Sequence, residues 1–177
     1  FRSYRLMILV DNQGSVLAVN NVDPTGKSLD TSSIYSLNFA NQPWFRKALA
    51  GEFLQGKNGL TGTVVEQPSA NDLVGKLYGN DGYSIVFAAP VKNAAGERIG
   101  VWVNFADFGL VEEIVMTFYK SLADRGLAGA DITVLGKDGK ILVDATPSKT
   151  GGTYTRNTSI VGVTDLASKG VVAARDA

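Results

Sequence analysis

Apolar and polar residues alternate through much of the first half of the chain, which is the pattern of half-buried β-strands. Residues 6–10 and 15–19 are apolar runs on either side of a turn that ends at Gly14, and together they predict a β-hairpin. Residues 83–91 and 98–105 form the clearest pair of runs, and the short polar segment between them predicts a second hairpin.

Two segments carry helix signals. Residues 43–50 begin with Pro43, which suits the first turn of a helix, and Gly51 follows them, which suits a C-cap. From Gly109 onwards the spacing becomes that of an amphipathic helix, which ends near Gly126. The apolar positions of this second helix are Leu110, Val111, Ile114, Val115, Phe118, Tyr119 and Leu122.

The segments between these elements complete the first half. Residues 20–33 predict a polar loop, and residues 61–66 predict a strand. Residues 67–82 contain several glycines and asparagines and predict a long loop. Long loops in compact domains often bind ligands, so we expect this one to lie near a site.

A third hairpin is predicted over residues 131–135 and 140–144, and its strand–turn–strand pattern repeats that of the first hairpin. Aligning Gly14 with Gly139 brings two strand–turn–strand patterns into register, and the second follows the long helix. We therefore expect a first module over residues 1–108, a connecting helix over 109–130 and a partial second module over 131–177.

The composition excludes much catalytic chemistry. The 177 residues include no cysteine and no histidine, which removes thiol nucleophiles, disulfides, zinc knuckles, haem ligation by histidine and the commonest general base. No Ser-x-x-Lys pair and no calcium-loop spacing of carboxylates occurs. We expect no enzyme activity, no cofactor and no metal. The 17 basic and 17 acidic residues are scattered, so we also expect no nucleic-acid partner.

The candidate site combines aromatic and polar residues on the first helix and at strand ends. Small-molecule sites commonly join aromatic walls to a few polar groups. The alternative for each aromatic residue is an ordinary place in the core. The candidate ligand-binding residues are Gln42, Trp44, Phe45, Tyr83, Asn104 and Asp107.

The order of these parts resembles the Cache sensor modules of bacterial receptors, specifically the double Cache type found in methyl-accepting chemotaxis proteins. The resemblance covers about residues 8–144. It rests on Asn-Gln-Pro-Trp-Phe-Arg-Lys-Ala-Leu-Ala-Gly at 41–51, Ser-Ile-Val-Phe-Ala-Ala-Pro-Val at 84–91 and Gly-Glu-Arg-Ile-Gly-Val at 96–101. It implies an α+β, PAS-like fold with an antiparallel sheet flanked by helices, in tandem modules of which the second is partial here.

The resemblance also implies a function. Such domains lie outside the cytoplasm, in the periplasm, between two membrane spans, and the membrane-distal first module binds a small ligand. The parent protein would be a chemoreceptor and a homodimer, although the chain alone could be a monomer. Sensor domains of histidine kinases or diguanylate cyclases, and indirect sensors that bind a partner protein, are the alternatives. Because the long N-terminal helix and both spans are absent from the sequence, we expect an excised ectodomain.

The chain departs from the motif of the amino-acid sensors in this family. Those sensors carry a Tyr, then Arg-x-Trp-Tyr-x-Asp on the first helix, and an Asp at the end of a late strand. The matching helix-region positions here are Leu37, Gln42, Trp44, Phe45 and Lys47. The late Asp falls near Phe105, two residues before Asp107. Without that Arg and Asp, the resemblance implies as ligand an organic acid, an amine, an amino-acid-like compound or a neutral small molecule.

Overall fold

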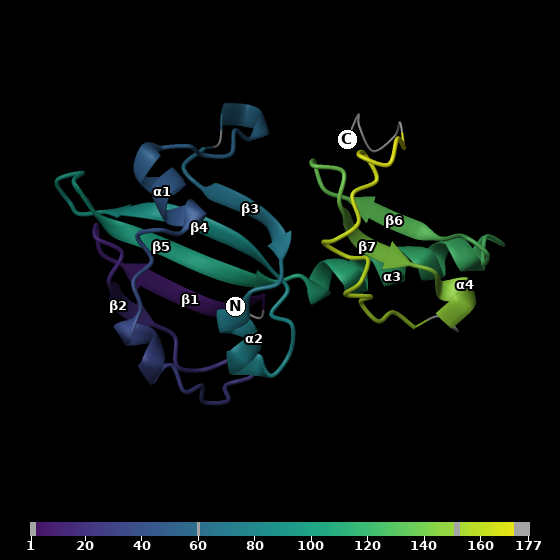
Figure 1. Cartoon of the computed structure of the whole chain (residues 1–177), viewed down its shortest axis with the longest axis horizontal. Coiled ribbons are helices and arrows are strands. Elements are labelled where there is room, and N and C mark those ends of the chain that lie inside the picture. Colours follow the sequence, from purple (N-terminus) through teal and green to yellow (C-terminus); the bar gives the residue numbers. More distant parts are fainter. Residues whose placement is uncertain (1–2, 60, 151–152, 172–177) are drawn as a thin grey trace. The chain divides into compact units, whose positions relative to one another are not determined.

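The computed structural model describes residues 3–59, 61–150 and 153–171 (Figure 1). The chain divides into two compact units, Phe1–Asp107 and Phe108–Ala177. The first unit is an α+β module on a five-stranded antiparallel sheet, and the second combines a long helix with a two-stranded sheet. Among the described residues, no helix is both long enough and apolar enough to cross a membrane.

The sheet of the first unit has the strand order β2-β1-β5-β4-β3, and every neighbouring pair is antiparallel. Both hairpins predicted from the alternation are present, as β1 with β2 and as β4 with β5. The strands are β1 (Tyr4–Val10), β2 (Val16–Val19), β3 (Val64–Ser69), β4 (Ser84–Lys92) and β5 (Arg98–Asp107).

One face of this sheet is buried under helices. Along β5, Val101, Val103 and Phe105 are at most 2% exposed, whereas Trp102 on the opposite face is 37% exposed. This alternation follows from the two-residue period of a strand. The helices α1 (Pro43–Ala50) and α2 (Asp72–Tyr78) supply residues to the same core, and Figure 1 shows both lying over one side of the sheet.

The helix α1 begins and ends at the residues predicted from Pro43 and Gly51. Pro43 occupies its first turn, and Gly51 ends it in the left-handed conformation with φ 75°. Trp44 and Phe45 are each 2% exposed, so the start of the helix is anchored in the core. A 3-10 turn, η1 (Ser32–Ser36), lies before it and buries Ile34 in the same core.

The prediction of an uninterrupted loop over 67–82 is wrong, because this segment contains α2. Asn71 caps the helix: its Oδ1 accepts hydrogen bonds from the backbone N–H groups of Leu73 and Val74, each at 3.1 Å. Gly79 ends the helix in the left-handed conformation with φ 66°. The preceding strand, β3, begins and ends three residues later than the predicted 61–66.

The second unit contains the predicted long helix and the third hairpin. Its elements are α3 (Gly109–Asp124), β6 (Ile132–Leu135), β7 (Ile141–Ala145) and the short α4 (Pro147–Thr150). Tyr119 of α3 is buried, as are Ile141 and Val143 of β7 and Val161. The contacts therefore group α3 with the hairpin, while the functional division at 108 and 130 stays a prediction.

Candidate ligand-binding site

A cavity of about 410 Å³ lies in the first unit, on the side of the sheet that the helices cover. Its walls come from the start of α1, from β3, from the start of α2 and from single residues of β4 and β5. Elements far apart in the sequence therefore meet around one space. The lining residues are Phe39, Gln42, Pro43, Trp44, Glu66, Ser69, Ala70, Asn71, Asp72, Leu73, Val86 and Phe105.

Trp44 forms the aromatic wall of this cavity. Its ring contacts Phe39 at 5.8 Å between centroids with a tilt of 41°, and it contacts Phe45 edge to face at 5.9 Å. These two contacts hold the indole in one orientation. Phe45 lies in the core beside it and does not line the cavity, because successive helix residues point in directions about 100° apart.

The polar lining of the cavity is acidic or neutral. Glu66 and Asp72 supply carboxylates, and Gln42 at the N-cap of α1 supplies an amide. The Oε1 atom of Glu66 lies 3.3 Å from the Nζ atom of Lys47, and this ammonium is 43% exposed. Among the described lining residues there is no lysine or arginine. The cavity is therefore better suited to a hydrogen-bond donor or a cation than to an anion.

Asn104 lies on the opposite face of the sheet. It follows Val103 and precedes Phe105, and alternation along β5 turns its side chain away from the helices. Its Oδ1 atom accepts a hydrogen bond of 2.7 Å from the indole of Trp102. Both residues line a smaller hollow of about 260 Å³ on that face, together with Tyr4, Thr63, Phe87, Ala88 and Ala89.

Asp107 is held by a cation rather than turned into the cavity. Its Oδ2 atom lies 2.6 Å from a guanidinium nitrogen of Arg5, and the same guanidinium lies 5.0 Å from the ring centroid of Tyr78. The hydroxyl of Tyr78 donates a 2.7 Å hydrogen bond to the carbonyl of Arg5. Burial, more than any nearby charge, raises the pKa of Tyr78. This cluster ties β1, the end of β5 and α2 together.

Tyr83 is 6% exposed and immediately precedes β4. Its backbone N–H donates to Asp81 Oδ1 at 3.2 Å, and its side chain is not among those that line the cavity. Of the six candidates, the structure thus brings Gln42 and Trp44 to one cavity. That these residues bind a ligand stays a prediction.

Several lining residues were not predicted from the sequence. Glu66 lies in β3, which begins three residues later than the predicted strand. The residues at the start of α2 lie in the segment predicted as a loop. The capping pair of Asn71 and Gly79 was the local signal that could have revealed α2. No comparable signal marks Phe39, Val86 or Phe105, because their place depends on long-range packing.

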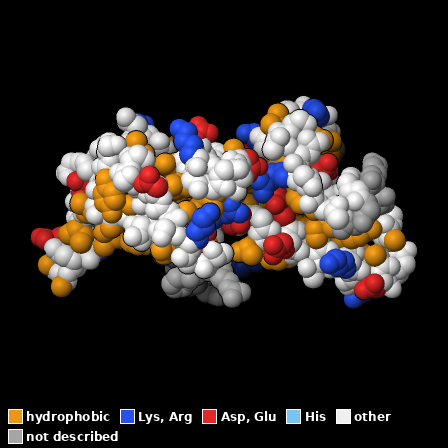
Figure 2. All heavy atoms as spheres, turned by 90° about the horizontal axis from the view of Figure 1, so that it is seen from below, with side chains coloured by type: hydrophobic (Ala, Val, Ile, Leu, Met, Phe, Trp, Pro, Cys, Tyr) orange, Lys and Arg blue, Asp and Glu red, His pale blue; other side chains and the backbone are white. Residues whose placement is uncertain are grey.

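Clusters of metal ligands and patches of like charge are two features that could indicate a further site among the residues that the structure describes. Within the described ranges, no three acidic side chains gather in a way that could hold a metal ion. Figure 2 shows acidic and basic side chains intermixed on the visible face of the molecule. This mixture agrees with the balanced composition.

Comparison with known proteins finds similarity in structure. No protein-family model and no curated protein matches the sequence. The ligand-binding domain of the amino acid chemoreceptor PctC of Pseudomonas aeruginosa PAO1, solved in complex with GABA, is similar with a TM-score of 0.54 and 16% identity over 96% of this chain. An extracellular ligand-binding receptor from Desulfohalobium retbaense DSM5692 is similar with a TM-score of 0.55 and 18% identity over 97% of this chain.

The matched part is only a portion of each of these structures. The chain spans 57% of the first and 25% of the second. At such low identities the similarity concerns the fold, and it agrees with the antiparallel sheet and flanking helices described above. The predicted fold class is confirmed at this level: the chain has an α+β, PAS-like fold, and this fold is similar to that of these two ligand-binding proteins.

Proposed function

We propose that this chain is the ligand-binding part of a transmembrane chemoreceptor, and that a small molecule binds in the cavity beside Trp44. The observation that carries the proposal is this cavity of about 410 Å³, which has an aromatic wall and a few polar groups. The similarity in fold to the PctC domain supports it, since that domain was solved with a small ligand. The parent receptor would hold the domain outside the cytoplasm.

The mechanism would be a shift between conformations. The cavity is bounded by α1, β3 and α2, so a ligand that contacts all three favours the arrangement in which they are close. A small displacement of these elements could then pass to the membrane spans of the parent protein. A histidine kinase or a diguanylate cyclase could use the same domain, and a partner protein could replace the small ligand.

Among the predicted ligand classes, the lining favours an amine. An ammonium group could pair with Glu66 or Asp72 and lie against the face of Trp44. A carboxylate would meet two carboxylates and no lining cation. An organic acid is therefore the less suitable ligand, and an amino-acid-like compound would bind through its ammonium end.

A thermal-shift screen of the purified chain tests the proposal. Primary amines, amino acids, carboxylates, purines and sugars would be compared. A ligand at 100 times its Kd stabilises the folded state by about 2.7 kcal/mol, which raises Tm by several degrees for a protein of this size. Glu66→Gln should reduce the shift caused by an amine, whereas Glu97→Gln, in an exposed turn, should not. A folded protein that no small molecule stabilises would favour a partner protein as the signal.

A further inference from the structure

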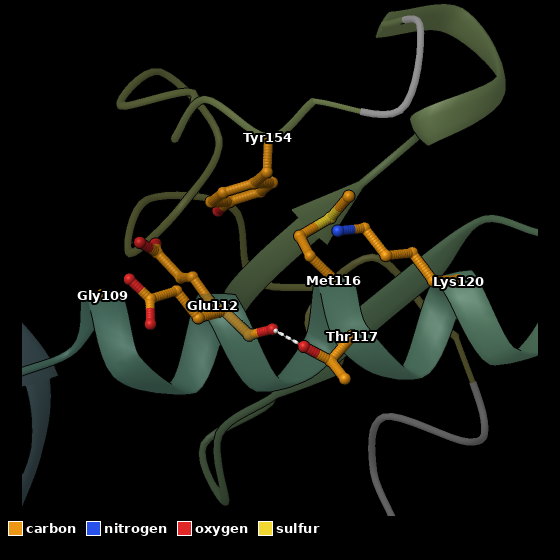
Figure 3. Close-up of a pocket in the computed structure, with 7 residues that line it drawn as sticks. Gly109, Glu112, Met116, Thr117, Lys120 and Tyr154 are labelled. Atoms are coloured by element: carbon orange, nitrogen blue, oxygen red, sulfur yellow. Dashed lines mark hydrogen bonds between the residues drawn. The ribbon is translucent and has the colours of Figure 1, made fainter.

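A second cavity, of about 520 Å³, lies in the second unit along one side of α3 (Figure 3). Its lining residues on the helix recur every three or four positions, so they share a single face. The proposed function does not use this cavity. The lining residues are Gly109, Glu112, Glu113, Met116, Thr117, Lys120 and Tyr154.

A buried ion pair fixes the wall opposite the helix. The guanidinium of Arg156 contacts Glu112 at two points, with Nε 2.7 Å from Oε1 and Nη2 2.8 Å from Oε2. The two side chains are only 15% and 11% exposed. Such a two-point contact is geometrically specific, and it attaches the segment that carries Tyr154 to α3. Figure 3 shows the Tyr154 ring lying over the helix face.

The ring of Tyr154 is an uncharged wall at neutral pH. Burial, reinforced by the negative charge of Glu112, raises the pKa of its hydroxyl further above neutrality. Arg156 in turn neutralises Glu112. The charge of the cavity therefore comes from its two remaining ionised lining residues, Glu113 and Lys120.

Glu113 and Lys120 place opposite charges at the two ends of the cavity. Both side chains are exposed, and within the described part of the chain neither forms an ion pair. Seven residues separate them, which corresponds to about 10.5 Å along the helix axis. Figure 3 shows Lys120 reaching back along α3 to lie beside Met116. The larger apolar groups of the lining are Met116 and the Tyr154 ring, and Glu112 and Thr117 also contribute to it.

We propose that this cavity is a second small-molecule site, and that it binds a linear zwitterion whose charged groups are separated by several methylenes. The ammonium group pairs with Glu113, the carboxylate pairs with Lys120, and the methylene chain lies between Met116 and Tyr154. A simple amine or a simple carboxylate satisfies only one end. An α-amino acid carries both charges on one carbon, so its charged groups cannot reach both partners.

The test is binding of a homologous series to the whole chain. Linear ω-amino acids, from glycine to eight carbons, would be titrated while backbone amide NMR signals are followed. We expect the affinity at α3 to rise to a maximum at one chain length. Glu113→Gln and Lys120→Gln should each weaken the best compound roughly tenfold. Asp124→Asn lies on the same helix outside the cavity, and Lys137→Gln lies in an exposed turn; neither should change the affinity.

Exchanging the two charges gives a sharper result. In the double variant Glu113→Lys and Lys120→Glu, the zwitterion can bind in the reverse direction, so the affinity lost in either single variant should return. No change in affinity in Glu113→Gln and Lys120→Gln overturns the proposal, as does the absence of signal changes along α3 with every compound of the series. Glu66→Gln separates the two sites, since it should affect only the cavity of the first unit.

Discussion

Each of the two units contains a hairpin, β1–β2 in the first and β6–β7 in the second, and the two turns form equivalent hydrogen bonds. In the first, the carbonyl of Gly14 accepts from the N–H of Phe39 at 2.8 Å, and in the second the carbonyl of Gly139 accepts from Leu166 at 2.9 Å. The residue after each glycine forms an isolated bridge with the segment that returns to the turn. The similarity between the two turns that the sequence predicts is therefore a similarity in structure as well.

The difference lies in what covers each hairpin. In the first unit, three further strands extend the sheet and two helices cover one face, so its cavity is bounded by several elements. In the second unit, the described elements add one long helix, and the cavity follows a single face of that helix. The same hairpin motif thus accompanies a cavity formed by long-range packing in one unit and a cavity along one helix face in the other.

The largest expected effect comes from the turn glycines themselves. Both have positive φ, 83° for Gly14 and 75° for Gly139. A Cβ at Gly14 would lie 2.3 Å from the backbone nitrogen of Ala40, and one at Gly139 would lie 2.4 Å from the Cβ of Ala167. Gly14→Ala should lower the free energy of unfolding by about 4 kcal/mol and Gly139→Ala by about 3 kcal/mol, measured by denaturant unfolding.

A control variant at Gly26 separates the cost of a positive φ from the cost of close contacts around the added Cβ. Gly26 also has positive φ, at 91°, but nothing lies within 4 Å of a Cβ built there. Gly26→Ala should therefore cost only about 1 kcal/mol. Equal losses at Gly14 and Gly26 would show that close packing against the returning segment contributes nothing.

The next largest effect is expected at the ion pair between Glu112 and Arg156 in the second unit. Arg156→Met leaves the carboxylate of Glu112 largely buried without its partner, which should destabilise the second unit by about 2 to 3 kcal/mol. Amide hydrogen exchange should speed up in α3 and β7 and stay unchanged in β4 and β5. The double variant Glu112→Leu with Arg156→Met should recover much of the loss. Faster exchange in the first unit alone would contradict this assignment.

The helix cap beside the first cavity should have a moderate effect. Asn71→Ala removes the acceptor for the N–H groups of Leu73 and Val74, so the stability should fall by about 1 kcal/mol. Asn71→Asp keeps an acceptor and should change the stability little, which serves as the control. Thermal unfolding followed by circular dichroism measures both variants.

The smallest effect is expected at the ion pair beside the first cavity. Because Lys47 is 43% exposed, Lys47→Met should change the stability by less than about 1 kcal/mol. The same change frees the carboxylate of Glu66 for a ligand, so the affinity for an amine should rise about two- to fivefold by calorimetry. A weaker affinity in this variant would mean that Lys47 itself contacts the ligand.

Local signals in the sequence were enough for most of the fold. Pro43 and Gly51 define α1, and the alternation of apolar residues defines the two hairpins of the first sheet. The short helix α2 was missed although its apolar residues Leu73, Val74, Leu77 and Tyr78 stand at helical spacing and pack against the core. The helix has only seven residues, and the glycines and asparagines in this segment favoured a loop. The caps at Asn71 and Gly79 are the signals for its two ends.

The site was less predictable than the fold. Gln42 and Trp44 were found together because they are neighbours at the start of one helix. Whether Asn104 or Phe105 faces the helices depends on which side of the sheet those helices cover, and alternation alone does not decide this. The contribution of Glu66 requires β3 to pack beside α1, a contact between segments about 20 residues apart that no local pattern indicates.

Tryptophan fluorescence tests the central claim most directly, because the chain has only two tryptophans and they lie on opposite faces of the first sheet. Trp102→Phe leaves Trp44 as the single indole, and titration with an amine identified by thermal shift should then change its emission saturably, with a Kd equal to that from calorimetry. In Trp44→Phe, the emission of Trp102 should stay constant. A ligand that binds by calorimetry yet changes only the emission of Trp102 would contradict a site beside Trp44.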